Sequence, residues 1–104
     1  MDTIPKQFTD FGKNYPEVMK AYEELGSSVH NAGPLDNKTR SLIKLSLAIG
    51  GRLEGAVHAH VRKALTAGCN AEEIRQTVLL ALPTLGMPAM MMAMTWVDDI
   101  LGNQ

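Results

Sequence analysis

Apolar residues spaced three and four apart, in segments closed by glycine or proline, constrain this 104-residue chain more than any other feature. Such spacing lays one apolar face along an α-helix. It occurs over residues 17–28, 37–50, 53–67, 71–82 and 89–101. No run alternates apolar and polar residues between turn signals, so no β-strand is expected. The sequence therefore predicts an all-α fold.

Local side-chain chemistry indicates where these helices begin and end. Asp36 is a candidate N-cap, and Asn70 with Glu73 three residues later has the spacing of a capping box. Pro83 and the turn formed by 86–88 are expected to interrupt the helical pattern before the last helix. The first dozen residues are expected to form at most a short helix.

The length predicts one domain, and the composition is that of a globular protein. Hydrophobic residues make up 45% and charged residues 20% of the chain, which is ordinary for a folded domain. We expect a single domain over 1–104, with about five to six helices and with 1–15 as an N-terminal extension or short helix. A chain this short buries a modest share of its surface, so association of copies would stabilise it.

Two helices are apolar round more of their circumference than one small core can cover. These are the helices at 36–50 and 89–101, and we expect them to form contacts in a homo-oligomer. The last helix and the turn before it are rich in methionine, which suits either a flexible core filling or a subunit contact that Trp96 could join. The methionines are Met87, Met90, Met91, Met92 and Met94.

Charge and cysteine content exclude several classes of partner. The formal net charge is −1 and no run of Lys or Arg stands out, so no nucleic-acid partner and no membrane surface is expected. Cys69 is the only cysteine, which rules out an intrachain disulfide and fits a cytoplasmic protein. No secretory signal and no apolar stretch long enough to span a bilayer is visible in the sequence.

Glu54, His58 and His60 make the helix at 53–67 the chemically richest segment. At about 100° per residue, His60 falls inside the apolar stripe, and His58 falls about 160° away on its edge, beside Glu54. The two histidines therefore face different sides and make a poor metal pair, so no metal and no cofactor is predicted.

Each of these groups has two interpretations. His60 is either a hydrogen-bonded core histidine or an acid/base group at the floor of a cleft. Glu54 and His58 are either an exposed helix pair or a catalytic carboxylate–imidazole couple. The sequence leaves both choices open.

An ordered set of motifs resembles the carboxymuconolactone decarboxylase / alkylhydroperoxidase D-like family. The motifs are Leu35-Asp36-x-x-Thr39-Arg40-Ser41-Leu42, Gly51-Arg52-x-Glu54, Ala59-His60-Val61-Arg62-x-Ala64-Leu65-x-Ala67-Gly68, Glu72-Glu73-Ile74 and Gly86-x-Pro88-Ala89. The resemblance covers about 16–101. It implies an all-α domain built around a helical hairpin, and dimers that assemble further, often into hexamers.

The peroxidase branch of that family uses a glutamate, a Cys-x-x-Cys pair and a histidine. By the resemblance, His60 matches the histidine, whereas Ser41 stands in place of the glutamate and Leu53 and Ala56 in place of the two cysteines. Peroxide reduction by that route needs a thiolate and a resolving thiol. Thiol peroxidase activity is therefore not expected, and Cys69 lies too far along the chain to replace the pair.

The decarboxylase branch acts on a butenolide dicarboxylate in aromatic-compound breakdown. By the resemblance, Arg40 or Arg52 would bind the retained carboxylate, with Ser41 beside Arg40 as a further substrate-binding candidate. His60 would stabilise the developing oxyanion or protonate the ring carbon. Glu54 would orient the histidine, and His58 is a further catalytic candidate.

Three functions remain open at this stage. The first is a lyase that decarboxylates a small unsaturated lactone acid, and the second is a non-catalytic oligomeric module that has lost the site. The third is a residual redox protein that uses Cys69 or a partner's thiol.

Overall fold

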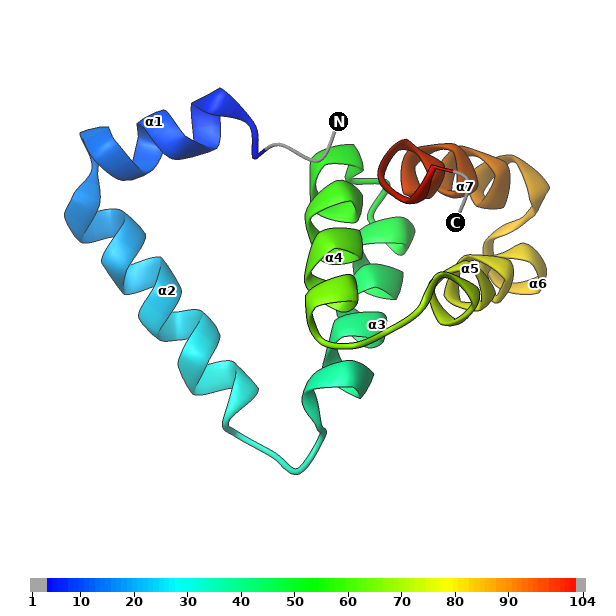
Figure 1. The fold of residues 1–104 in the computed structure, drawn as a ribbon, viewed down its shortest axis with the longest axis horizontal. Helices are drawn as coiled ribbons and strands as arrows, with labels where there is room; N and C mark the ends of the chain where they lie inside the picture. Colours follow the sequence, from blue (N-terminus) through cyan, green and yellow to red (C-terminus); the bar gives the residue numbers. More distant parts are fainter. Residues whose placement is uncertain (1–3, 103–104) are drawn as a thin grey trace. The chain divides into compact units, whose positions relative to one another are not determined.

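The computed structural model describes residues 4–102 and confirms the all-α class, because it contains seven helices and no β-strand in that range (Figure 1). The helices are α1 (Lys6–Asn14), α2 (Pro16–His30), α3 (Asn37–Gly50), α4 (Glu54–Thr66), α5 (Ala71–Leu79), α6 (Ala81–Leu85) and α7 (Met87–Leu101). They belong to two compact units, 4–35 and 36–102. The expectation of one domain over 1–104 stays a prediction.

In the unit formed by 36–102, helix α4 has the most extensive packing. The short turn after Gly50 folds α4 back along α3 as a helical hairpin, and α4 also packs against α7 (Figure 1). Val57, Val61 and Ala64 lie on the face of α4 turned to these neighbours and are fully buried. The core also contains Leu45, Ala48, Ile49, Cys69, Ile74, Val78, Ala81, Met90, Ala93, Val97, Ile100 and Leu101.

The two predicted N-caps are confirmed. The backbone N–H of Thr39 donates to the Asp36 carboxylate at 2.8 Å, and this hydrogen bond lowers the pKa of Asp36. At α5 the capping box is complete, because the Glu73 N–H donates to the Asn70 side chain at 2.8 Å and the Asn70 N–H donates to the Glu73 carboxylate at 2.9 Å.

The C-terminal end of α4 is closed by a Schellman motif centred on Gly68. The Gly68 N–H donates to the Leu65 carbonyl at 3.1 Å, and the Cys69 N–H donates to the Ala64 carbonyl at 2.9 Å. Gly68 has φ +97°, a backbone conformation that glycine adopts without steric cost. The motif directs Cys69 inward, where it joins the apolar core.

The predicted breaks at Pro83 and Pro88 do not end helical structure. Pro83 lies in the first turn of the five-residue helix α6, which is the element that the sequence did not predict. Helix α7 begins at Met87, two residues earlier than expected, with Pro88 in its first turn. A proline is tolerated there because the first N–H groups of a helix have no intrahelical acceptor. The break itself falls on Gly86, whose φ is +101°.

The unit formed by 4–35 has no core of its own. Pro16 opens α2 in its first turn as the sequence indicates, and α2 packs on α1. Neither helix contains a buried residue. Large apolar side chains are instead exposed along both helices and at the junction between them, at Phe8, Phe11, Tyr15, Val18, Tyr22, Leu25 and Val29.

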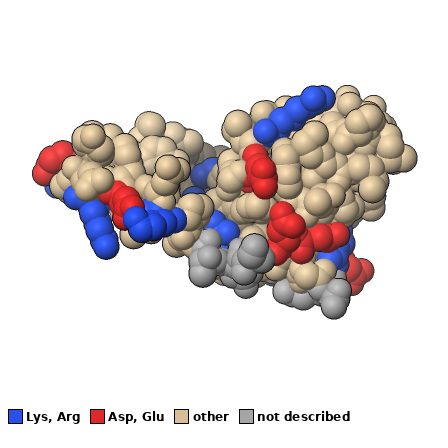
Figure 2. Space-filling view, turned by 90° about the horizontal axis from the view of Figure 1, so that it is seen from above, with Lys and Arg blue, Asp and Glu red and all other residues tan. Residues whose placement is uncertain are grey.

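The described residues can be compared with what a membrane-spanning or a uniformly charged protein would show. Among 4–102, no helix has the length and apolar character needed to cross a membrane. On the face drawn in Figure 2, acidic and basic side chains both occur, with wide uncharged areas between them.

The capping box gives a direct test of the local energetics. We expect Asn70→Ala to lower the free energy of unfolding by about 1 kcal/mol, because it leaves an N–H at the start of α5 without its side-chain acceptor. Urea unfolding followed by circular dichroism measures this change. Gln76→Ala, at an exposed position of the same helix, is the control and is expected to stay within about 0.5 kcal/mol of the wild type. Equal midpoints for the two variants would contradict the assignment.

Candidate functional site

Helix α4 has polar side chains on both edges of its buried apolar stripe, which consists of Val57, Val61 and Ala64. His60 lies at one edge, and His58 lies at the other, where it contacts Asp99 on α7. Both imidazoles are half-buried, so His60 is less enclosed than its place in the apolar stripe predicts. The two edges bring together different residues.

The first edge combines His60 with the beginning of α3. Ser41 is buried at 8% exposure, although its neighbours in the core are apolar. The Nδ1 atom of His60 and the Nε atom of Arg40 are also buried. A polar atom removed from water in this way costs free energy unless the surroundings or a ligand compensate for it. The sequence-predicted residues Arg40, Ser41 and His60 therefore concentrate polar atoms in the α3–α4 hairpin.

Two lysines that the sequence analysis did not select extend this edge. Burial lowers the pKa of Lys44, and the nearby charges of Lys63 and Arg40 lower it further. Arg40 and Lys44 are neighbours because they lie four apart on α3, and Lys63 follows His60 by three positions on α4. We call Arg40, Lys44 and Lys63 the basic cluster, and through Lys63 it reaches the side of α4 that carries His60. Like charges held together in this way favour binding of an anion.

Arg52 is not part of the basic cluster. It lies in the exposed turn between α3 and α4, whereas Arg40 lies in the first turn of α3. Ten helical residues between them correspond to about 15 Å along the axis. Arg52 also has φ +57°, in the left-handed region that residues other than glycine seldom occupy. Of the two arginines proposed for a substrate carboxylate, Arg40 is the one that lies close to Lys44.

The second edge of α4 brings three metal-ligating or proton-transferring groups together. The Nε2 atom of His58 lies 2.9 Å from the Oδ2 atom of Asp99 on α7. Glu54, one turn before His58, completes a group whose nitrogen and oxygen atoms all lie within 4.8 Å of one another. Glu54 therefore lies with His58 rather than in a position to orient His60, which is six residues further along α4.

Cys69 has the surroundings of a structural thiol. It is buried, and its Sγ–H donates to the Lys38 carbonyl oxygen at 3.8 Å. Burial raises the pKa of the thiol, and the carboxylate of Glu73 raises it further. A thiol with a raised pKa is a weak nucleophile at neutral pH.

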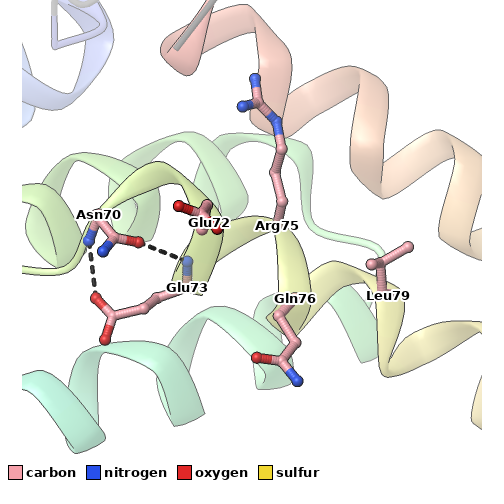
Figure 3. A pocket seen from close by; sticks show the side chains of 6 residues that line it. All are labelled: Asn70, Glu72, Glu73, Arg75, Gln76 and Leu79. Carbon is pink, nitrogen blue, oxygen red and sulfur yellow. Dashed lines mark hydrogen bonds between the residues drawn. The ribbon is translucent and has the colours of Figure 1, made fainter.

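A shallow pocket on α5 lies apart from both edges. It is lined by Asn70, Glu72, Glu73, Arg75, Gln76 and Leu79 (Figure 3). The capping-box hydrogen bonds occupy its Asn70–Glu73 end, and the Arg75 guanidinium donates to Asp98 on α7 at 3.0 Å. Its lining contains none of the sequence-predicted site residues, so it contributes nothing to the candidate chemistry.

Lys44 and Asp99 were not selected from the sequence, and only one of them could have been. Lys44 could have been found, because it is four residues after Arg40 on a strongly apolar helix. Asp99 could not, because it is 41 residues from His58 and their contact depends on how α7 packs on α4.

Comparison with known proteins identifies relatives of this chain by sequence and by structure. A protein from Haemophilus influenzae, itself uncharacterized, is 39% identical over 61 residues, which span 59% of this chain and 54% of that protein. An uncharacterized protein from Methanocaldococcus jannaschii is 28% identical over 92 residues, which span 88% of this chain and 86% of that protein.

A solved structure extends the comparison to three dimensions. The apo crystal structure of a carboxymuconolactone decarboxylase family protein from Legionella pneumophila has a TM-score of 0.77 and 27% identity, over 91% of this chain and 85% of that chain. The sequence model of the carboxymuconolactone decarboxylase family matches residues 16–99, which include both edges of α4. The chain therefore belongs to the carboxymuconolactone decarboxylase family.

Proposed function

We propose that this protein is a lyase that decarboxylates a small unsaturated lactone acid. The observation that carries the proposal is the basic cluster of Arg40, Lys44 and Lys63, in which Lys63 lies one turn after His60 on α4. A substrate with two carboxylates needs cationic groups to hold the one that is retained, next to a group that can exchange a proton. Family membership supports the same class of reaction.

In the proposed mechanism, the basic cluster binds the substrate and His60 acts on the charge or the proton that the reaction moves. Arg40, assisted by Lys44 and Lys63, binds the retained carboxylate. The bond between the ring carbon and the departing carboxylate breaks, carbon dioxide leaves, and the electron pair moves into the conjugated lactone. His60 then stabilises the charge on the lactone oxygen or delivers a proton to the ring carbon. Ser41, buried next to Arg40, is a further donor for the substrate.

The runner-up is a non-catalytic oligomeric protein that keeps the family fold without the cysteine pair. The extensive exposed apolar surface of α1, α2, α3 and α7 favours it. The cations of the basic cluster favour the enzyme, because a purely structural hairpin gains nothing from holding like charges close together. A cytoplasmic location stays a prediction from the single cysteine.

Replacement of His60 tests the proposed reaction. We expect His60→Gln to lower decarboxylation of carboxymuconolactone by about 10²-fold or more, because glutamine cannot exchange a proton at neutral pH. Release of carbon dioxide measures the rate. His58→Gln is the matched control and is expected to cost much less, because His58 lies on the other edge of α4. Full activity in His60→Gln with only a lower melting temperature would identify His60 as a core histidine.

Homo-oligomer formation is part of the proposal. Ile43 and Leu47 on α3 are exposed, as are Met87 and Met91 on α7, and Leu47 reaches 68% exposure. Met90 is buried, and Met94 packs against the core. The methionine-rich segment therefore supplies both the core and an apolar outer surface, which supports subunit contacts through α3 and α7.

The mass in solution tests this assembly. We expect light scattering at micromolar concentration to give a dimer or a larger assembly, such as a trimer of dimers. Leu47→Glu is expected to shift the mass toward smaller species, because a carboxylate cannot be buried against an apolar partner surface. Ser46→Glu, at the adjacent exposed position, is the control. A monomer mass for the wild type rules out the assembly.

Thiol peroxidase activity is expected to be absent. With an organic hydroperoxide and a dithiol reductant, wild type and Cys69→Ser should both turn over no faster than the uncatalysed reaction, because the Cys69 thiol is buried and its pKa is raised. Turnover that only the wild type shows makes Cys69 a redox group. Turnover in both proteins reveals a different peroxidase site.

A further inference from the structure

The geometry points to a binding site for a divalent transition-metal ion formed by Glu54, His58 and Asp99. This site lies on the α7 side of α4, and it requires none of the residues that take part in the mechanism of the proposed function. It goes beyond the proposed function, so either one can fail without the other.

The backbone places the three ligands from two helices that are packed together. Glu54 and His58 are four apart on α4, so they project from the same face one turn apart. The same four-residue spacing brings two ligands to one ion in helical zinc motifs. Asp99 comes from α7, which packs on α4, and both helices contribute residues to the same core, among them Val57, Val61 and Val97. Helix packing thus fixes the positions from which all three side chains start.

The ligand atoms are close enough for one ion to reach them all. The imidazole nitrogen and the two carboxylate oxygens lie within 4.8 Å of one another. Tetrahedral zinc, with ligands at about 2.0–2.2 Å, needs its ligand atoms about 3.3–3.5 Å apart. His58 and Asp99 are already at 2.9 Å, so an ion between them requires a slight separation. Glu54 is exposed and can turn inward by about an ångström through its side-chain torsions.

The donor set selects the class of metal. One imidazole nitrogen and two carboxylate oxygens suit Zn²⁺ and neighbouring transition ions, whereas Mg²⁺ prefers oxygen ligands alone. Three protein ligands leave a coordination position for water, as in sites that are open to small molecules. Without an ion, the contact between His58 and Asp99 is an ordinary hydrogen bond between α4 and α7, and the experiment must separate these two roles.

Zinc binding by the full-length protein, measured by isothermal titration calorimetry after removal of metal with a chelator, tests the site. We expect one Zn²⁺ per chain and a rise in melting temperature with added Zn²⁺, because an ion that binds only the folded state stabilises it. His58→Gln and Asp99→Asn are expected to weaken binding by at least about 10²-fold, since each removes a direct ligand.

Two further variants keep the test independent of folding. Glu54→Gln changes an exposed side chain, so it should leave the apo protein folded while it weakens zinc binding. Asp98→Asn changes the adjacent carboxylate, which pairs with Arg75 instead, and it should bind zinc like the wild type. The site is overturned if the wild type binds no stoichiometric Zn²⁺, or if Glu54→Gln and His58→Gln bind it as tightly as Asp98→Asn does.

Discussion

The packing of α4 against two helices at once is the constraint on which the rest of the structure depends. Val57, Val61 and Ala64 form a stripe that is fully removed from water, and this burial is the main favourable contribution that the hairpin receives. Because the stripe is narrow, the residues at its two edges are only half-buried. One edge therefore faces α3 and its cations, and the other faces α7 and its carboxylate.

This arrangement places cationic side chains and carboxylates on different sides of α4. Arg40, Lys44 and Lys63 gather on one side of α4, while Glu54 and Asp99 lie beside His58 on the other. In the two proposals, a carboxylate-bearing molecule binds at the first edge and a cation at the second. The two histidines, only two residues apart, can in this way serve different ligands. The packing of the helix, rather than the histidine spacing, decides what each can bind.

Much of the fold could be predicted because helix caps and apolar periodicity are local. Asp36 and Asn70 act as N-caps through hydrogen bonds to residues three positions away, which a sequence displays directly. Pro83 was misjudged because a proline that ends one helix also fits the first turn of another. For the site, His60 and Arg40 could be selected from the sequence. Asp99 could not be selected, because its role depends on contact between distant helices.

The left-handed backbone at Arg52 has a consequence for engineering. A side chain in that conformation costs about 1–2 kcal/mol, although glycine occupies it freely. A search for thermostable variants would therefore favour Arg52→Gly, which relieves the turn between α3 and α4 and at the same time removes a cation. At this position the substitution that raises stability also removes a positive charge. Selection for heat resistance alone would therefore lower the positive potential at this end of the hairpin.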